Sequence, residues 1–391
     1  MTSDADGRRY QEAINPRLLG VLCILLAAGL LGVGLWPFHS PWNQVTWRAD
    51  GRGVRFGDHG TILSPSYLHA PHAQEGGPCS LELWVEPQLN SSSGAIVAFY
   101  QPDRSRQFSL RQSLSDLELH VEYHEPWRRT RTTRLYVSDI LRARKTTFLT
   151  ITANGERTSV YVDGSPLRLD RGFRLSSQDL EGTLIIAASP SSNDSWSGDM
   201  LGLALYDRQL NASEVLRHYQ TWNDKGRPET AAGEGMVALY LFNEGAGRAI
   251  HNQITSGADL YVPDRYMLVN AAFLEPFWDA FDNERGYWED VLENIGGFVP
   301  FGFLVYAYLS LSGRIRRVAL VAILLGFAIS LTIETLQVFL PTRDSDTTDL
   351  ITDTLGTCLG AGLYRLNFCR LLFARIWTLF FQRLVVWRPQ V

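Results

Sequence analysis

Long apolar runs occupy both ends of the chain, while short alternating segments fill the middle. The first run extends from Leu18 to Trp36 and contains no charged residue. At about 1.5 Å per residue, a helix over this run would be about 28 Å long, close to the thickness of the hydrocarbon core of a membrane. Two later runs, Ile295 to Leu311 and Val318 to Leu340, have the same character, and a shorter one from Leu350 to Leu363 contains Asp353. The pattern predicts a helical membrane bundle of about four helices.

The residues that flank these runs predict that the first helix is retained and how the helices are oriented in the membrane. The first run ends in Trp36-Pro37-Phe38, which is typical of an interfacial anchor and unlike the small-residue cleavage site of a signal peptide, so we expect a retained helix. Positively charged residues mark the cytoplasmic ends of membrane helices. They place the N-terminus in the cytoplasm and the middle of the chain outside a bacterial inner membrane. These basic residues are Arg8, Arg9, Arg17, Arg314, Arg316, Arg317, Arg365 and Arg370.

The last segment, 369–391, has two interpretations. As a fifth span it would carry Arg370, Arg375 and Arg383 into the hydrocarbon, at about 2.5–3.5 kcal/mol each near the bilayer centre. As an Arg-rich amphipathic helix on the anionic cytoplasmic surface it would keep those charges near water. The second interpretation is favoured, and the first stays open.

The middle of the chain has the pattern of an antiparallel β-sandwich. Leu81 to Val85 and Phe148 to Ala153 alternate apolar and polar residues. Asn154-Gly155 and Asp163-Gly164 are hairpin signals beside such segments. A helical period appears in Ala212 to Tyr219, after Asn211 as a candidate cap. Cys79 is the only cysteine of this region, so the fold must be stabilised by its hydrophobic core and not by an internal disulfide.

Four segments of this region are informative together: Cys79 to Pro87, Tyr161 to Gly164, Gly198 to Glu214 and Leu241 to Gly247. They resemble the laminin G-like, concanavalin A-like jelly-roll family. Cys79-Ser-Leu-Glu-Leu-Trp-Val-Glu-Pro87 looks like its central strand, and Tyr161-Val-Asp-Gly164 looks like its hairpin. The run from Gly198 to Glu214 is similar to its last strand and the helical turn that follows, and Leu241 to Gly247 to a recurring strand and turn. The family includes lectins, protein binders and enzymes, so the resemblance implies a fold and leaves the ligand open.

Candidate chemistry in this domain favours binding over catalysis. The sequence shows no paired-carboxylate glycosidase pattern, no GxSxG and no HExxH, so whether the protein is an enzyme stays open, leaning to no. His120 and His124 could share a strand face, but they have no third metal ligand nearby and are expected to be surface histidines. Asp163, Asp199 and Asn243 could supply oxygen ligands for calcium, although Asp at a turn is common for backbone reasons. A net charge of −5 over 391 residues argues against nucleic acid as a partner.

The stretch 290–364 contains five elements rich in polar and small residues. They are Asp290-Val-Leu-Glu-Asn294, Pro300-Phe-Gly302, Ser330-Leu-Thr-Ile-Glu334-Thr-Leu-Gln337, Arg343-Asp-Ser-Asp346 and Asp349 to Gly360. In this order they resemble the VanZ-like family, named for a protein associated with teicoplanin resistance. Asp353 departs from the family pattern, which usually has asparagine there. The resemblance implies a role in cell-wall or exopolysaccharide processes, or in glycopeptide tolerance, and it implies no biochemical activity.

Helical spacing gathers the polar residues of this region near one membrane surface. Ser330, Glu334 and Gln337 share one helix face, and so do Asp349 and Asp353 together with the packing glycines Gly356 and Gly360. Asn294 is expected to start the second helix at the same surface. Intramembrane carboxylates are functional candidates, but Glu334 could also be neutral or paired with Arg343 and serve helix packing. The predicted polar site is Asn294, Ser330, Glu334, Gln337, Arg343, Asp349 and Asp353, and the predicted packing residues are Pro300, Gly302, Gly356 and Gly360.

Three functions are compatible with this organisation. The first is an envelope protein that binds a glycan outside and a membrane lipid head group or lipid-linked glycan near Glu334. The second is an intramembrane enzyme acting on a lipid-linked precursor, with or without a divalent metal on Glu334, Asp349 and Asp353. The third is an adaptor for another envelope protein. The predicted parts are a cytoplasmic tail (1–16), helix one (17–38), the jelly-roll domain (41–263), an aromatic-rich interfacial connector (264–290), the VanZ-like helices two to four (291–368) and the Arg-rich tail (369–391).

Overall fold

The computed structural model divides into two compact units, Ser40–Ala271 and a second unit made of Met1–His39 with Ala272–Val391. The first of these units is therefore inserted between the first helix and the remaining helices. The structure describes residues 14–69, 75–90, 93–103, 106–123, 130–225, 235–254, 258–280, 285–313 and 315–385. Each unit is built around its own hydrophobic clusters.

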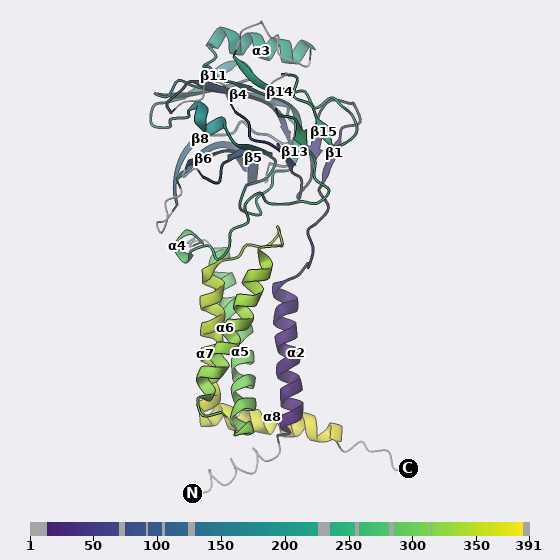
Figure 1. Ribbon diagram of the computed structural model, residues 1–391, viewed down its shortest axis with the longest axis vertical. Helices are drawn as coiled ribbons and strands as arrows, with labels where there is room; N and C mark the ends of the chain where they lie inside the picture. Colours follow the sequence, from purple (N-terminus) through teal and green to yellow (C-terminus); the bar gives the residue numbers. More distant parts are fainter. Residues whose placement is uncertain are drawn as a thin grey trace. The chain divides into compact units, whose positions relative to one another are not determined.

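The inserted unit is an antiparallel β-sandwich whose two sheets have eight described strands each (Figure 1). In the first sheet β13 lies between β2 and β4, and β14 also pairs with β13. The first sheet comprises, in spatial order, β1 (Val45–Trp47), β2 (Val54–Phe56), β13 (Gly198–Tyr206), β4 (Cys79–Pro87), β9 (Thr147–Ala153), β10 (Thr158–Val162) and β11 (Ser165–Asp170), with β14 (Met236–Tyr240) beside β13. The second comprises β15 (Ala249–Ile250), β16 (Leu260–Tyr261), β3 (Ile62–Leu63), β12 (Thr183–Ile186), β5 (Ser93–Tyr100), β6 (Arg106–Ser113), β7 (Asp116–Tyr123) and β8 (Arg131–Val137).

Turn chemistry sets this topology as the sequence predicts. The left-handed residues Asp163 and Gly164, with φ of 50° and 77°, connect β10 directly to β11, which is the hairpin conformation that Asp-Gly favours. At the other hairpin, the Asn154 side chain accepts hydrogen bonds from the N–H groups of Glu156 and Arg157. The jelly-roll prediction is confirmed.

The helix α3 (Ala212–Lys225) covers the outer face of the first sheet. Asn211 caps its first turn by accepting from Ser213 and Glu214, as expected, but the helix continues six residues beyond the predicted Tyr219. A fully buried polar group fixes it to the sheet: Glu82 on β4 accepts from the Tyr206 hydroxyl at 2.8 Å and lies 3.0 Å from Nδ1 of His218. The helix is therefore an integral layer of the unit.

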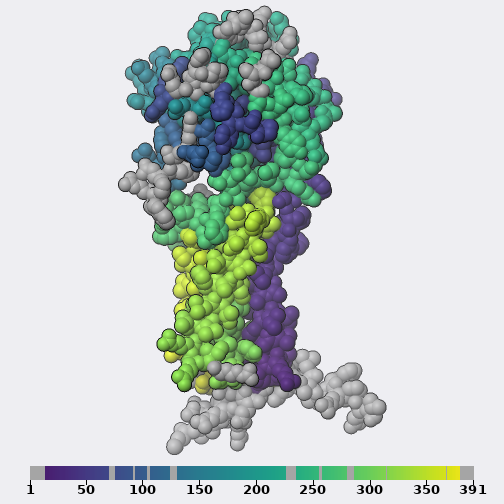
Figure 2. All heavy atoms as spheres, in the orientation of Figure 1, coloured from purple at the N-terminus to yellow at the C-terminus, as the bar shows by residue number. Residues whose placement is uncertain are grey.

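The second unit is a helical bundle with a crosswise helix at one end. In Figures 1 and 2, α2 is the purple helix along one edge of the bundle. Length and hydropathy mark α2, α5 and α6 as able to cross a membrane among the described residues, whereas α7 is less apolar. The helices are α2 (Pro16–Gly34), α4 (Phe277–Ala280), α5 (Arg285–Ser312), α6 (Val318–Gln337), α7 (Thr347–Arg365) and α8 (Asn367–Val385).

The C-terminal helix α8 lies across the ends of the other helices (Figure 1). Ala374 and Trp377 are buried there in a cluster with Leu19 of α2 and Tyr364 of α7, while Arg375 faces outward. This crosswise position (Figure 1) is the one that the surface-lying alternative for the tail predicts, and that alternative stays a prediction. The side chain of Arg383 is not among those that the structure describes. Arg8, Arg9 and Arg314 lie outside the described residues.

One expectation for the segment before the bundle is wrong. Asn294 does not start the second helix, because α5 begins nine residues earlier at Arg285; its first turns are polar, so the apolar run underestimates its length. The aromatic connector 264–290 could be a helix at the membrane interface or be buried against the β-domain, and its described residues form no single helix. Tyr266 is fully buried in the β-unit, Phe273 and Phe277 are exposed, and α4 is only four residues long.

Candidate functional site

Hydrogen bonds between α5, α6 and α7 join most of the predicted polar site. The Asn294 amide donates to Oδ1 of Asp349 at 2.6 Å, linking α5 to α7. The Ser330 hydroxyl donates to Oδ2 of Asp353 at 2.8 Å, and the N–H of Asp346 donates to Oε2 of Glu334 at 2.9 Å, each linking α6 to the α7 region. Ser330, Glu334 and Asp353 are all at least 95% buried.

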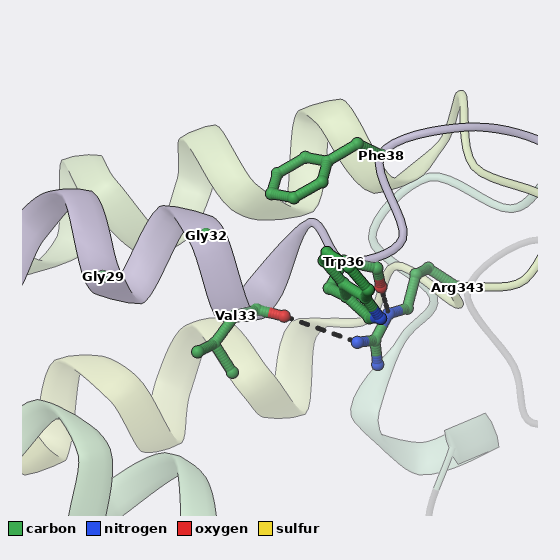
Figure 3. A pocket seen from close by; sticks show the side chains of 6 residues that line it. All are labelled: Gly29, Gly32, Val33, Trp36, Phe38 and Arg343. Carbon is green, nitrogen blue, oxygen red and sulfur yellow. Dashed lines mark hydrogen bonds between the residues drawn. The ribbon is translucent and has the colours of Figure 1, made fainter.

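The two other predicted residues bind the end of α2. Gln337 donates from Nε2 to the carbonyl of Gly34 at 3.0 Å. Arg343 donates from Nε to the carbonyl of Trp36 at 2.9 Å and from one terminal nitrogen to that of Val33 at 3.4 Å (Figure 3). Helix C-termini leave carbonyls unpaired and carry partial negative charge, so a guanidinium is favourable here. The polar residues thus connect four helices at one end of the bundle.

The expected alternative partner of Glu334 is not found. Within the described residues, no ion pair joins Glu334 to Arg343, because the arginine is turned to α2. Nor does any group of three or more His, Cys, Asp or Glu in the described part of the chain have the arrangement of a metal site. The idea of a metal held by Glu334, Asp349 and Asp353 therefore has no support from the geometry.

Two buried oxygens of this cluster have no hydrogen-bond partner among the described residues. They are Oδ1 of Asp353 and Oε1 of Gln337. A buried acceptor without a donor costs about 1–3 kcal/mol, so each is a place where a hydroxyl, an amine or water would be stabilised. Interhelical packing alone does not account for them.

Glycines allow α7 to approach its neighbours. A Cβ on Gly360 would lie 2.0 Å from the carbonyl oxygen of Val299, and one on Gly302 would lie 2.1 Å from that of Thr357. Gly356 faces the carbonyl of Ile295 in the same way, at 2.4 Å. Pro300 is different: its side chain is exposed, so the prediction that it packs between helices is wrong.

The outward face of the second sheet carries a polar patch on β6, β7 and β8. Register aligns Ser109, His120 and Arg134 in one row and Arg111, Glu118 and Tyr136 in the next. The sequence-based expectation for His120 was an ordinary surface histidine, but it is 5% exposed and hydrogen-bonds Glu118 at 2.6 Å. Burial lowers the pKa of His120 more than Glu118 raises it, which favours the neutral ring. His124, the other histidine of that prediction, lies outside the described residues.

Two members of this polar patch are more open. Tyr136 is 45% exposed and Arg134 is exposed, and the arginine donates to the tyrosine hydroxyl at 3.3 Å. The other half of the same face, on β3, β12 and β5, is covered by Tyr266 and its neighbours. We define the sheet patch as Arg111, Glu118, His120, Arg134 and Tyr136. Sequence reasoning missed it because only strand register brings these residues together.

The three predicted calcium ligands are not brought together. Asp199 is 3% exposed and binds two guanidinium groups, from Arg48 at 2.6 Å and Arg55 at 2.7 Å. Asp163 accepts from the N–H of Phe148 and lies three strands away, at about 4.8 Å per strand. Asn243 is exposed in a loop. Asp199 is an ion-pair centre and Asp163 a turn residue.

Two family models match the chain and confirm both resemblances. Residues 236–371 match the model described as VanZ/LLP1, and residues 62–216 match the concanavalin A-like lectin/glucanases superfamily. The chain therefore combines a VanZ-like region, with helices suited to a membrane, and a concanavalin A-like domain. A comparison with curated proteins found no match.

Solved structures resemble the chain only distantly. One is a putative carbohydrate binding protein from Bacteroides ovatus ATCC 8483, 12% identical, covering 54% of this chain and 62% of its own length, with a TM-score of 0.36. Another is the SAP-like pentraxin of Limulus polyphemus, 14% identical, covering 54% of this chain and 99% of its own, with a TM-score of 0.31. The binding domain of Paraclostridial Mosquitocidal Protein 1 is 12% identical, covering 47% and 46%, with a TM-score of 0.32. The chain thus spans less than two thirds of the first of these.

Proposed function

We propose that this chain, which joins a VanZ-like helical region to a concanavalin A-like domain, is a bacterial inner-membrane protein that binds an envelope glycan outside the cell membrane. Its N-terminus and α8 lie on the cytoplasmic side, and the β-unit is extracytoplasmic. The helical region holds a lipid head group or lipid-linked glycan at the outer leaflet. The physiological process is cell-wall or exopolysaccharide metabolism, or glycopeptide tolerance.

The sheet patch is the observation that carries glycan binding. Lectin domains occur on this fold, and small-ligand sites combine aromatic surface with a few placed polar groups. Tyr136 offers an exposed ring, while Arg134 and Arg111 offer donors and Glu118 an acceptor. His120 is buried and bonds Glu118 through Nε2, so its part in the patch is to position that carboxylate.

Glycan binding by the full chain in lipid nanodiscs tests this function. Saturable binding to one or more envelope glycans on a panel is expected, and Arg134→Ala with Tyr136→Ala should weaken it about tenfold or more, as for the loss of a charged hydrogen bond. Arg157→Ala, exposed on the turn after β9, is the matched control and should bind normally. Parallel series with calcium and with a chelator test whether calcium takes part. A folded chain that binds no glycan on the panel would contradict the proposal.

The unpartnered oxygens of Asp353 and Gln337 favour a polar ligand in the helical unit. A hydroxyl or amine of a head group or lipid-linked sugar would satisfy them. A polyprenyl-diphosphate-linked disaccharide is the probe: Asp353→Leu should weaken its binding, whereas Thr354→Val on the outer side of the same helix should not. Turnover of the probe, lost in Glu334→Gln with binding intact, would instead favour the intramembrane enzyme. Capture of a protein partner by the sheet patch would favour the adaptor.

A further inference from the structure

An open groove of about 560 Å³ lies against the last turns of α2. Its volume is within the range of about 300–1,000 Å³ typical of small-ligand sites. It runs from Gly29 to Trp36, which is about 10 Å along the helix axis or roughly a third of the hydrocarbon core. Figure 3 shows Val33 and Phe38 beside this part of α2 and the Arg343 guanidinium at its end. We define the α2 groove by its lining residues, Gly29, Gly32, Val33, Trp36, Phe38 and Arg343.

The glycines of this groove differ from the packing glycines of the bundle. A Cβ built on Gly29 or Gly32 has no atom within 4 Å, whereas one on the nearby Gly34 would lie 2.8 Å from Ile333 of α6. Small residues in membrane helices are usually explained by close approach of another helix. No described helix approaches Gly29 or Gly32, so these two residues leave an uncovered strip of helix surface.

The walls of the groove have the composition of a membrane interface. Trp36 and Phe38 are 65% and 55% exposed and pack edge to face, with ring centroids 5.7 Å apart. Phe38 holds a left-handed conformation with φ of 62°, which is unfavourable for a residue with a Cβ, and its N–H donates to the carbonyl of Leu35 at 2.7 Å. The loop thus presents a ring over the groove at the depth where aromatic residues anchor proteins.

The Arg343 guanidinium gives the groove one charged end. Two of its N–H groups are used by the carbonyls of Trp36 and Val33. The other three N–H groups have no partner among the described residues, and no carboxylate there lies within ion-pair distance of this guanidinium. A cation left without a counterion beside apolar surface attracts an anion, and the planar fork of arginine matches phosphate oxygens.

We propose that the α2 groove binds an anionic glycerophospholipid, with the phosphate on Arg343 and one acyl chain along Gly29 and Gly32. Charge complementarity selects the head group, and the uncovered apolar strip accommodates the chain. The orientation of the lipid follows from the geometry, because the Arg343 guanidinium lies at the end of α2 that carries the interfacial residues Trp36 and Phe38. Arg343 belongs to the predicted polar site, but its guanidinium is turned to the end of α2, whereas Glu334 binds the N–H of Asp346. The groove is therefore a second ligand site; it rests on the membrane placement in the proposed function and not on glycan binding by the sheet patch.

Lipid retention by the full chain, measured by native mass spectrometry, tests this assignment. Phosphatidylglycerol should bind more tightly than phosphatidylcholine, and Arg343→Gln should abolish that preference by weakening phosphatidylglycerol about tenfold or more, as for loss of a charge-assisted hydrogen bond. Gly32→Leu should weaken both lipids because it fills the groove. Gly296→Leu is the matched control: Gly296 is equally open and lies on α5, outside the groove.

Gly32→Leu keeps the test decisive if Arg343→Gln destabilises α2, because no atom lies within 4 Å of a Cβ at Gly32. Equal retention of phosphatidylglycerol by the unsubstituted chain and both groove variants would overturn the proposal. It would also be overturned if the polyprenyl-diphosphate probe displaced phosphatidylglycerol completely at equal concentration, since the groove would then prefer a lipid-linked glycan. Failure of glycan binding by the β-unit leaves this prediction unaffected.

Discussion

Replacing Gly360 by alanine tests how tightly α7 is fitted against α5. The added Cβ would lie 2.0 Å from the carbonyl oxygen of Val299 and 2.7 Å from the backbone nitrogen of Phe303. Contacts below 3.0 Å are essentially never seen for a real Cβ, so the two backbones must separate by about 1 Å. Both obstructing atoms belong to backbone, which cannot rotate away as a side chain could.

The expected cost follows from that separation. Overpacking usually costs about 1–3 kcal/mol, and a clash with backbone belongs at the upper end, about 3 kcal/mol. The helix itself gains about 1 kcal/mol when glycine becomes alanine, so the net destabilisation is about 2 kcal/mol. Gly362 is two residues further along α7, and a Cβ there has no atom within 4 Å. Gly362→Ala should therefore show only the gain in helix propensity. The unfolding free energies of the two variants should differ by about 3 kcal/mol.

Thermal unfolding of the two purified variants in one detergent measures the difference. Gly360→Ala should have a Tm roughly 6–12 °C below that of Gly362→Ala, at about 2–4 °C per kcal/mol. Equal Tm values would refute the reasoning, because they would mean that α5 and α7 do not approach each other as closely as the two glycines allow.

Two further predictions concern the β-unit. Tyr206→Phe removes the hydroxyl that donates to the fully buried Glu82, so this unit should lose about 1–3 kcal/mol of unfolding free energy, measured by urea-dependent proteolysis. Tyr219, on α3, is only partly buried, so Tyr219→Phe should cost less. Equal losses in the two variants would contradict the role of the Glu82 hydrogen bonds. His120 has a folded pKa below 6.5, so the unfolded chain binds the proton first and stability should fall as the pH drops below 6.5 toward that lower value. His120→Gln should make the unfolding free energy flatter over this window, and an unchanged slope would show that other groups cause it.

Local sequence signals predicted the β-sandwich well because its strands and turns are defined by neighbouring residues. The Asp163-Gly164 turn and the Asn211 cap need only a few adjacent residues, and both form as expected. Asp199 shows the limit of such reasoning. It looked like a calcium ligand, but its partners Arg48 and Arg55 are 151 and 144 residues away, and only the pairing of β13 with β2 brings them close.

The helical unit shows the same limit at longer range. Helical periodicity correctly grouped Ser330, Glu334 and Gln337 on one buried face of α6. It could not identify the partners, because these depend on which helices are neighbours: Gln337 binds a carbonyl 303 residues away, and Arg343 binds one 307 residues away. The backbone N–H of Asp346, which binds Glu334, gives no sequence signal.

Hydrogen-bond partners divide the atoms of the polar cluster into those that hold helices together and those that are open to a ligand. Bonds such as Asn294 to Asp349 hold helices together, at about 0.6 kcal/mol each on average in membranes, so the six bonds between elements described above contribute about 4 kcal/mol. Packing explains the atoms that make those bonds. It does not explain Oδ1 of Asp353 or Oε1 of Gln337, which are buried and have no protein partner in the described chain. Because an unsatisfied buried group costs more than one such bond contributes, a structure selected for stability alone would replace these side chains, and their presence favours ligands that pair with them.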